Sequence, residues 1–213
     1  MQKVPKFAVF ASGRGSNFEA ICSAVDDETI FGELVCLVCD QPEAPVIEKA
    51  KQKDIPVVLV PKEKSKKEHE AKIIETLDAF KPDFIVLAGY MRVFTEDFID
   101  HYRSSLGYSK IINIHPSILP SFPGVNSYQQ AFDYGCHLAG VTIHLVEKEV
   151  DSGPICQQQS FSISECHSVK EVEELGLQIE HELYPKVIDW VINENFELAM
   201  NSKDRRRFRV RPC

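Results

Sequence analysis

The chain has 213 residues, of which 44% are hydrophobic and 26% charged, so it can bury one α/β core with at most a small appended piece. Its formal net charge of −8 argues against nucleic acid as the main partner, because phosphate backbones attract a basic surface. The apolar run at the amino terminus is too short for a signal peptide, and no run approaches the roughly 20 residues of a transmembrane helix. We therefore expect a cytoplasmic protein without a membrane partner.

Strand-like and helix-like segments alternate through the first half of the chain. The expected strands are short apolar runs, namely Val4–Ala11, Glu33–Cys39, Ile55–Val60, Asp83–Ala88 and Ile111–Ile114. The expected helices are Phe18–Val25, Ala44–Lys53, Lys66–Phe80 and Thr95–His101. This alternation predicts an α/β fold with a doubly wound, mostly parallel sheet that has helices on both faces.

The pattern changes after Gly124. A helix over Asn126–Tyr134 is followed by two strands without a helix between them, Leu138–Val146 and Pro154–Ile163, which predicts an antiparallel C-terminal portion. One long helix then contains Pro185, which we expect to kink it. The last two expected elements are this helix and a final edge strand, over Val169–Asn193 and Phe196–Met200.

No repeat, low-complexity segment or linker marks a second domain, so we expect a single domain over residues 1–202. Residues 203–213 form a basic tail that carries the run Arg205–Arg211. We interpret this tail as a solvated end, with anion or partner binding as the alternative.

The seven cysteines argue against a disulfide framework, because their number is odd and several lie in apolar runs. Cys36 and Cys39 have C-x-x-C spacing inside a strand-like run, without a second pair or a nearby histidine. We expect two buried structural thiols there rather than a zinc site.

A glycine-rich turn, Ser12–Asn17, lies between the first expected strand and the first expected helix. Free backbone N–H groups and the helix dipole favour an anion at such a place. Phe18 occupies the third glycine position of a dinucleotide fingerprint, and no Lys-Ser/Thr pair follows as in a P-loop. Three interpretations stay open: glycines needed only for the turn, a single-phosphate site and a dinucleotide site.

The segment Lys110–Gly124, KIINIHPSILPSFPG, joins a buried strand to a proline-stiffened loop. Asn113 and His115 lie two residues apart and so leave the same face of the strand, at the end where open α/β sheets bind ligands. An amide beside an imidazole can hold the oxygen of a tetrahedral intermediate and move its proton. Alternatively, both side chains only satisfy the backbone of the loop.

Asp151 opens a tight turn between the two antiparallel strands, where its simplest role is to form the turn. If this pair folds back on the sheet, Asp151 can reach His115. A carboxylate there favours the protonated imidazole, so we expect a raised pKa for His115 and a role as an acid near neutral pH.

Large apolar side chains follow the fourth expected strand, in Tyr90–Phe94. They indicate either core packing or an apolar slot for a flat heterocycle. His137 and His144 flank a strand and are expected to be structural. The histidines share no ligand spacing, so we predict no metal, and no Gly-x-Ser-x-Gly elbow supports a serine hydrolase.

Five segments together carry a family resemblance: FASGRGSNFEAI, VLAGYMRVF, INIHPSILPSFPG, GVTIHLVEKEVDSGPI and QIEHELYP. In this order and spacing, from about Phe7 to about Ala199, the chain resembles the formyltransferase family that uses 10-formyltetrahydrofolate. Within that family it resembles the branch that formylates glycinamide ribonucleotide in purine biosynthesis. The resemblance implies a Rossmann-like fold, with a phosphate-binding half over about 1–100 and a folate and catalytic half over about 101–202.

The resemblance also implies roles for particular residues. The catalytic trio would be Asn113, His115 and Asp151. The ribonucleotide would be held by Gly15, Ser16 and Asn17 at its phosphate and by Glu180 at its amine. The folate would meet Lys66, Met91, Arg92, Val93, Phe94, Asn113, Lys148, Glu149 and Val150. Lys66 stands where the family leads us to expect an arginine near the folate tail, and lysine lacks the two-point fork to a carboxylate.

The implied partners are small molecules, glycinamide ribonucleotide and the formylated folate as co-substrate, and the expected state is a monomer or homodimer. A deformylase resembles the same family but usually adds an amino-terminal regulatory domain; because the first strand is expected to begin near Phe7, we do not expect that domain here. Methionyl-tRNA formyltransferase would need a carboxyl-terminal tRNA-binding domain. A non-catalytic nucleotide-binding module would not need Asn113, His115 and Asp151 together.

Overall fold

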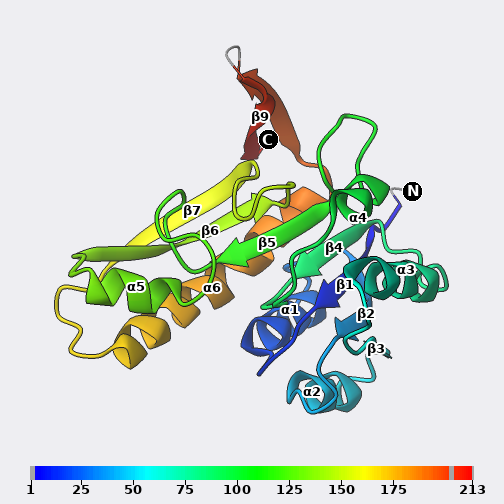
Figure 1. Ribbon diagram of the computed structural model, residues 1–213, viewed down its shortest axis with the longest axis horizontal. Coiled ribbons are helices and arrows are strands. Elements are labelled where there is room, and N and C mark those ends of the chain that lie inside the picture. The colour runs from blue at the N-terminus through cyan, green and yellow to red at the C-terminus, as the bar shows by residue number, and fades with distance from the viewer. Residues whose placement is uncertain (1–2, 202–203, 213) are drawn as a thin grey trace.

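The computed structural model describes residues 3–201 and 204–212, and its centre is a seven-stranded sheet in the order β3-β2-β1-β4-β5-β6-β7 (Figure 1). The strands of this sheet are β1 (Lys6–Phe10), β2 (Glu33–Cys39), β3 (Val57–Leu59), β4 (Phe84–Leu87), β5 (Ile111–His115), β6 (Leu138–Leu145) and β7 (Ile155–Ser162). Strands β1 to β5 are parallel, and β6 and β7 are antiparallel. The predicted doubly wound sheet with an antiparallel portion is confirmed.

Helices cover both faces of the sheet. They are α1 (Ser16–Asp26), α2 (Val46–Gln52), α3 (Lys66–Leu77), α4 (Glu96–His101), α5 (Ser127–Asp133) and α6 (Val169–Ile192). Along β1, Phe7 and Val9 pack into the core under α1 and α6, whereas Ala8 and Phe10 pack into the core under α3 and α4. Strand β1 is therefore apolar at every buried position because neither of its faces meets water.

Strand order reverses between β1 and β4, because the chain winds outward from β1 to β3 and then crosses to β4 and β5. A crevice forms at the carboxyl ends of the strands at such a reversal. The loops that follow β1, β4 and β5 all open at this edge. The fold therefore brings together three loops that are far apart in the sequence.

The carboxyl-terminal segment differs from expectation. Strand β8 (Phe196–Asn201) does not extend the main sheet but pairs antiparallel with β9 (Asp204–Pro212) in a separate two-stranded sheet. This hairpin projects from the rest of the molecule in Figure 1. The prediction that Phe196–Met200 forms an edge strand of the main sheet was wrong, because this strand belongs to the separate hairpin. Most of the predicted basic tail forms the second strand of that hairpin, over 204–212. Residues 202, 203 and 213 of this region lie outside the described residues. The sequence did not predict this pairing because the strand over 204–212 is rich in arginine and was interpreted as a solvated tail.

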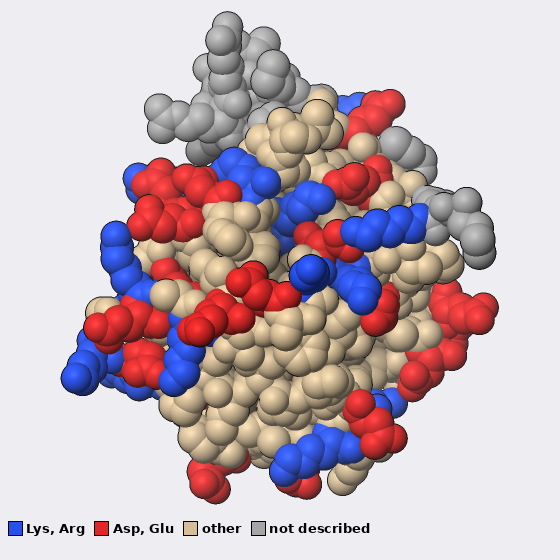
Figure 2. Space-filling view, turned by 90° about the vertical axis from the view of Figure 1, so that its right-hand side faces the viewer, with Lys and Arg blue, Asp and Glu red and all other residues tan. Residues whose placement is uncertain are grey.

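Acidic and basic side chains are interspersed over the face shown in Figure 2. Exposed ion pairs such as Lys72–Glu63 and Lys67–Asp97 involve helix α3. Within residues 3–201 and 204–212, no helix has both the length and the apolarity that crossing a membrane requires.

Candidate active site

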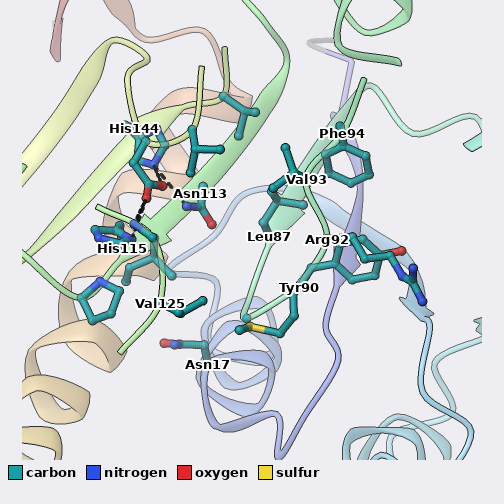
Figure 3. Close-up of a pocket in the computed structure, with 18 of the residues that line it drawn as sticks. Asn17, Leu87, Tyr90, Arg92, Val93, Phe94, Asn113, His115, Val125 and His144 are labelled. Atoms are coloured by element: carbon teal, nitrogen blue, oxygen red, sulfur yellow. Dashed lines mark hydrogen bonds and ion pairs between the residues drawn. The ribbon is translucent and has the colours of Figure 1, made fainter. Parts of the chain in front are cut away.

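A cavity of about 360 Å³ opens at the carboxyl ends of β4 and β5. Its walls come from the loop that follows β4, the end of β5, the loop before α5, the turn between β6 and β7, and single residues of α1 and α6. Figure 3 shows Asn113, His115 and His144 grouped on one side of the cavity, and Leu87, Val93 and Phe94 on the other. The cavity thus has a polar wall opposite an apolar wall.

Asp151 completes the polar wall. Its Oδ2 lies 3.5 Å from Nδ1 of His115, and its Oδ1 lies 3.6 Å from Nε2 of His144. The backbone N–H of Gly124 donates to the same carboxylate at 2.7 Å. Burial acts to raise the pKa of Asp151, but the neighbouring His144, the hydrogen bond from the Gly124 N–H and the nearby His115 outweigh it, so this pKa lies below its usual range. Asp151 is therefore a partly buried carboxylate that stays charged.

His115 has a defined tautomer in this wall. Its Nε2 is 3.0 Å from the carbonyl oxygen of Phe122, which can only accept, so Nε2 carries the proton. Nδ1, on the side of Asp151, then has a free lone pair. Burial lowers the pKa of His115, and the opposing effects of Phe122 and Asp151 do not restore it. The expectation of a raised pKa was wrong, because desolvation exceeds the attraction of a carboxylate 3.5 Å away.

His144 joins the polar wall next to Asn113. Its Nδ1 donates to the carbonyl of Leu145 at 3.0 Å, which leaves Nε2 to accept from the Asn113 amide at 3.1 Å. This bond fixes the carboxamide and uses one of its two N–H groups. The second N–H of Asn113 remains for a ligand. His144 was expected to be only structural; it lines the cavity and orients Asn113.

Glu180 reaches the cavity from α6 and is 6% exposed. Asn17 donates to one carboxylate oxygen at 2.7 Å, and the hydroxyl of Tyr128 donates to the other at 2.9 Å. Burial raises the pKa of Glu180, although both hydrogen bonds oppose the shift. The site therefore holds a second carboxylate, which is more deeply buried than Asp151 and has different partners.

The loop after β4 is divided between core and cavity. Tyr90 and Phe94 are 8% and 7% exposed and their rings are stacked, with centroids 5.6 Å apart, so core packing describes these two side chains. Met91 and Val93 are 68% and 48% exposed. These two, with Val150 of the opposite turn, form an apolar rim around the cavity.

A buried carboxylate outside the cavity holds this loop in place. Asp40, 3% exposed, accepts from Nε of Arg92 at 2.6 Å and from Oγ of Ser12 at 2.6 Å. Ser12 in turn accepts from the backbone N–H of Met91 at 3.1 Å. The loop is thus hydrogen-bonded to the ends of β1 and β2.

Helix α3 holds the same loop from its other side. His69 contacts the Tyr90 hydroxyl at 2.8 Å, and the buried Glu70 accepts from both the backbone N–H and the hydroxyl of Thr95. Hydrogen bonds from both sides therefore fix the conformation of this loop.

Comparison with known proteins identifies the fold and the family. The model of the formyl transferase family matches residues 5–188. The chain belongs to the formyl transferase family. It is 42% identical over 192 residues to the phosphoribosylglycinamide formyltransferase of Bacillus subtilis, covering 89% of this chain and 96% of that protein.

Solved structures agree with this assignment. The chain matches the crystal structure of glycinamide ribonucleotide transformylase 1 from Geobacillus kaustophilus with a TM-score of 0.84 and 38% identity, over 89% of this chain and all of that one. A formyltetrahydrofolate deformylase from Pseudomonas syringae shares the fold alone, with a TM-score of 0.85 at 23% identity; this chain covers 66% of its length.

In this member of the formyl transferase family, the sequence-predicted residues fall into two groups. Those that line the cavity are Asn17, Met91, Arg92, Val93, Phe94, Asn113, His115, Val150, Asp151 and Glu180. Those that lie outside it are Gly15 and Ser16 at the start of α1, Lys66 at the start of α3, and Lys148 and Glu149 in the turn before Asp151. Lys148 instead pairs with Glu96 at 2.5 Å. The binding and catalytic roles of both groups stay predictions.

Several site residues were missed by the sequence reasoning. Ser127 lies 3.2 Å from Nε2 of His115 and donates to the Phe122 carbonyl, and Tyr128 donates to Glu180. His144 could have been found from the sequence, because it is a polar side chain within the apolar strand β6. In the structure it is paired with Asn113 on the neighbouring strand β5. No grouping of His, Cys, Asp and Glu suited to a metal ion occurs in the part of the chain that the structure describes.

Proposed function

We propose that this protein transfers the formyl group of 10-formyltetrahydrofolate to the amine of glycinamide ribonucleotide, giving formylglycinamide ribonucleotide and tetrahydrofolate. The observation that carries the proposal is that one cavity joins Asn113, His115 and Asp151 to the buried carboxylate of Glu180. The family membership and the glycinamide ribonucleotide transformylase relatives support it.

The acceptor would bind between α1 and α6. Gly15 has a left-handed φ of 75°, and the first helical hydrogen bond runs from Glu19 N–H to its carbonyl, which leaves the N–H groups of the first turn for a phosphate. Asn17 follows directly and its side chain reaches Glu180. One short segment would therefore hold the phosphate at one end and, through Glu180, the amine at the other.

The folate would bind against the apolar wall. The Met91 and Val93 side chains and Val150 offer the apolar surface that a flat heterocycle requires. The backbone of this loop is already fixed by Ser12, as described above. Binding would then not need to order it.

In the proposed reaction, the neutral amine nitrogen attacks the formyl carbon, so a nitrogen–carbon bond forms and the carbonyl oxygen becomes an oxyanion. The second N–H of Asn113 stabilises this oxyanion. The bond between the formyl carbon and N10 of the folate then breaks, and the electron pair stays on N10. Holding both reactants in attack geometry can supply several kcal/mol of the acceleration.

Two proton movements complete the reaction: one proton leaves the attacking amine and one reaches N10. His115 is neutral and has a free lone pair at Nδ1, so it can take the first proton there. The charged Asp151, 3.5 Å away, stabilises the imidazolium that forms. His115 then returns the proton toward N10, through a water where the distance requires it, and no covalent enzyme intermediate forms.

The test follows the absorbance of a formylated folate analogue with the purified protein, with and without glycinamide ribonucleotide. Turnover that requires the ribonucleotide supports the transferase. Turnover without an amine would indicate a deformylase. No turnover in either case would leave a nucleotide-binding module and refute the proposal.

A further inference from the structure

The carboxylate of Glu180 has an unusual set of partners for a buried acid. Each of its oxygens accepts one hydrogen bond from a neutral group, Asn17 on α1 and Tyr128 on α5. No basic side chain of the described residues pairs with it, whereas the buried Asp40 pairs with Arg92 at 2.6 Å. A buried charge without a cation is costly, so its negative charge is stabilised mainly by these two donors.

Helix α6 makes room for the tyrosine donor at one position. Gly176 lies one turn before Glu180, and a Cβ there would come within 2.1 Å of the Tyr128 hydroxyl and 2.3 Å of Cζ. Glycine in a helix interior costs about 1 kcal/mol relative to alanine. Glycine at position 176 therefore leaves the space on α6 that the Tyr128 ring and hydroxyl occupy.

The state of the hydroxyl suits a donor. Tyr128 is 6% exposed, and burial, reinforced by the nearby carboxylates of Glu180 and Glu173, raises its pKa well above the usual range. The hydroxyl therefore stays protonated, and its hydrogen points to the carboxylate.

Tyr128 also sits on the element that holds the proton carrier. It is the second residue of α5, and the residue before it, Ser127, lies 3.2 Å from Nε2 of His115. A few residues earlier, the N–H of Gly124 donates to Asp151. One short segment, Gly124–Tyr128, thus contacts the proton carrier, its carboxylate partner and Glu180.

Resting on the proposed function, we propose that Tyr128 is a positioning residue that holds the Glu180 carboxylate ready for the amine of the acceptor substrate. The amine offers N–H groups to a carboxylate whose orientation is fixed by Tyr128 and Asn17. Through the Gly124–Tyr128 segment, that orientation is kept in register with His115. Tyr128 itself need not touch either substrate.

The groups around Glu180 define what a pH experiment reports. Tyr128 contacts it from α5 and Asn17 from α1. Tyr184, one turn further along α6, donates to the carbonyls of Leu87 and Ile112 and stays a distant neighbour. The polar wall across the cavity adds His115, His144 and Asp151. Of these, Tyr128 is the donor that can be removed with the loss of one oxygen atom. Removing it takes away a hydrogen bond that lowers the pKa of Glu180, so this pKa rises further.

The experiment compares Tyr128→Phe with Tyr134→Phe, an exposed tyrosine at the other end of the same helix. In Tyr128→Phe we expect the KM for the ribonucleotide to rise about tenfold, because a hydrogen bond to a charged group is lost, while the KM for the folate stays within about twofold. The acidic limb of kcat/KM for the ribonucleotide should move to higher pH. Tyr134→Phe should match the wild type.

Two further measurements separate this inference from the proposed function. Carbon-13 NMR of the glutamate carboxyls, with Glu180→Gln for assignment, should show the Glu180 titration at higher pH in Tyr128→Phe, without any substrate. Gly176→Ala, whose Cβ would displace the Tyr128 hydroxyl, should also move the Glu180 titration to higher pH. An unchanged titration, or a KM that rises equally for both substrates, overturns the role of Tyr128. A wild type inactive with the ribonucleotide overturns the proposed function instead.

Discussion

Nδ1 of His115 and Oδ2 of Asp151 lie 3.5 Å apart, although one residue ends β5 and the other lies in the turn between β6 and β7. The antiparallel pairing of β6 with β5 folds this turn back over the carboxyl end of the sheet. Since His115 carries its proton on Nε2, this pair becomes an ion pair only when a proton arrives at Nδ1. The arrangement favours a base that becomes an acid during turnover.

His115→Ala and Asn113→Ala should each reduce kcat by roughly a hundredfold or more, because each removes an acid–base or oxyanion group. Steady-state kinetics at saturating concentrations of both substrates measures the effect. His137→Ala, at a histidine outside the cavity lining, serves as the control. Near-wild-type turnover in either active-site variant would remove that residue from the mechanism.

Asp151→Asn should move the acidic limb of the pH–rate profile to lower pH. Burial already lowers the pKa of His115, and the negative charge of Asp151 opposes this effect. Without that charge the pKa of His115 falls further, so the imidazole stays neutral at more acidic pH. A limb at the same pH as in the wild type would contradict the coupling of the two residues.

Glu180→Gln should stabilise the protein at alkaline pH while it reduces activity. The pKa of Glu180 is raised above its ordinary 4.5 in the folded protein, so the folded state binds this proton more tightly than the unfolded chain. The resulting stability is fully present below the unfolded pKa and is lost as pH rises through the folded pKa.

Glutamine at position 180 carries no charge that must be buried. The melting temperature of the Glu180→Gln variant should therefore exceed that of the wild type at pH 8, by about 2–4 °C for each kcal/mol of unfolding free energy gained. The gap should narrow toward pH 4. Thermal melts across this range test the expectation, and a gap independent of pH contradicts it.

Gly15→Ala should cost roughly 2 kcal/mol or more of unfolding free energy and raise the KM for the ribonucleotide. The residue has a φ of 75°, and a Cβ would lie 2.5 Å from Cγ2 of Val46. Gly13→Ala in the same turn is a matched control, because its Cβ would meet nothing within 4 Å. Urea denaturation compares the two; equal losses would show that the turn tolerates a side chain at position 15.

Asp40→Asn should raise the KM for the folate about tenfold, because the hydrogen bond from the Arg92 guanidinium loses its charged acceptor. The KM for the ribonucleotide should change far less, since Asp40 supports the loop after β4. Glu43→Gln, at an exposed position nearby, should leave both constants unchanged. Equal changes in both KM values in Asp40→Asn would indicate general loosening of the fold instead.

The strands of the main sheet and the helices around it were predictable because their apolar patterns are clear. In β1, for example, an unbroken apolar run reflects burial on both faces, with alternate residues in the two cores. The candidates Asn113, His115 and Asp151 were also available from local motifs. The pKa of His115 was not, because it depends on desolvation by surrounding atoms. Tyr128 and Asp40 were missed for a similar reason: each acts through a contact across the fold, with Glu180 and Arg92.

The loop that follows β4 is fastened from behind by Ser12, Asp40, His69 and Glu70. Compounds made to compete for this wall therefore meet a fixed template instead of a closing flap. A rigid compound whose shape matches this wall should therefore have a longer residence time than a compound extended by flexible substituents, since the loop itself rearranges little on binding.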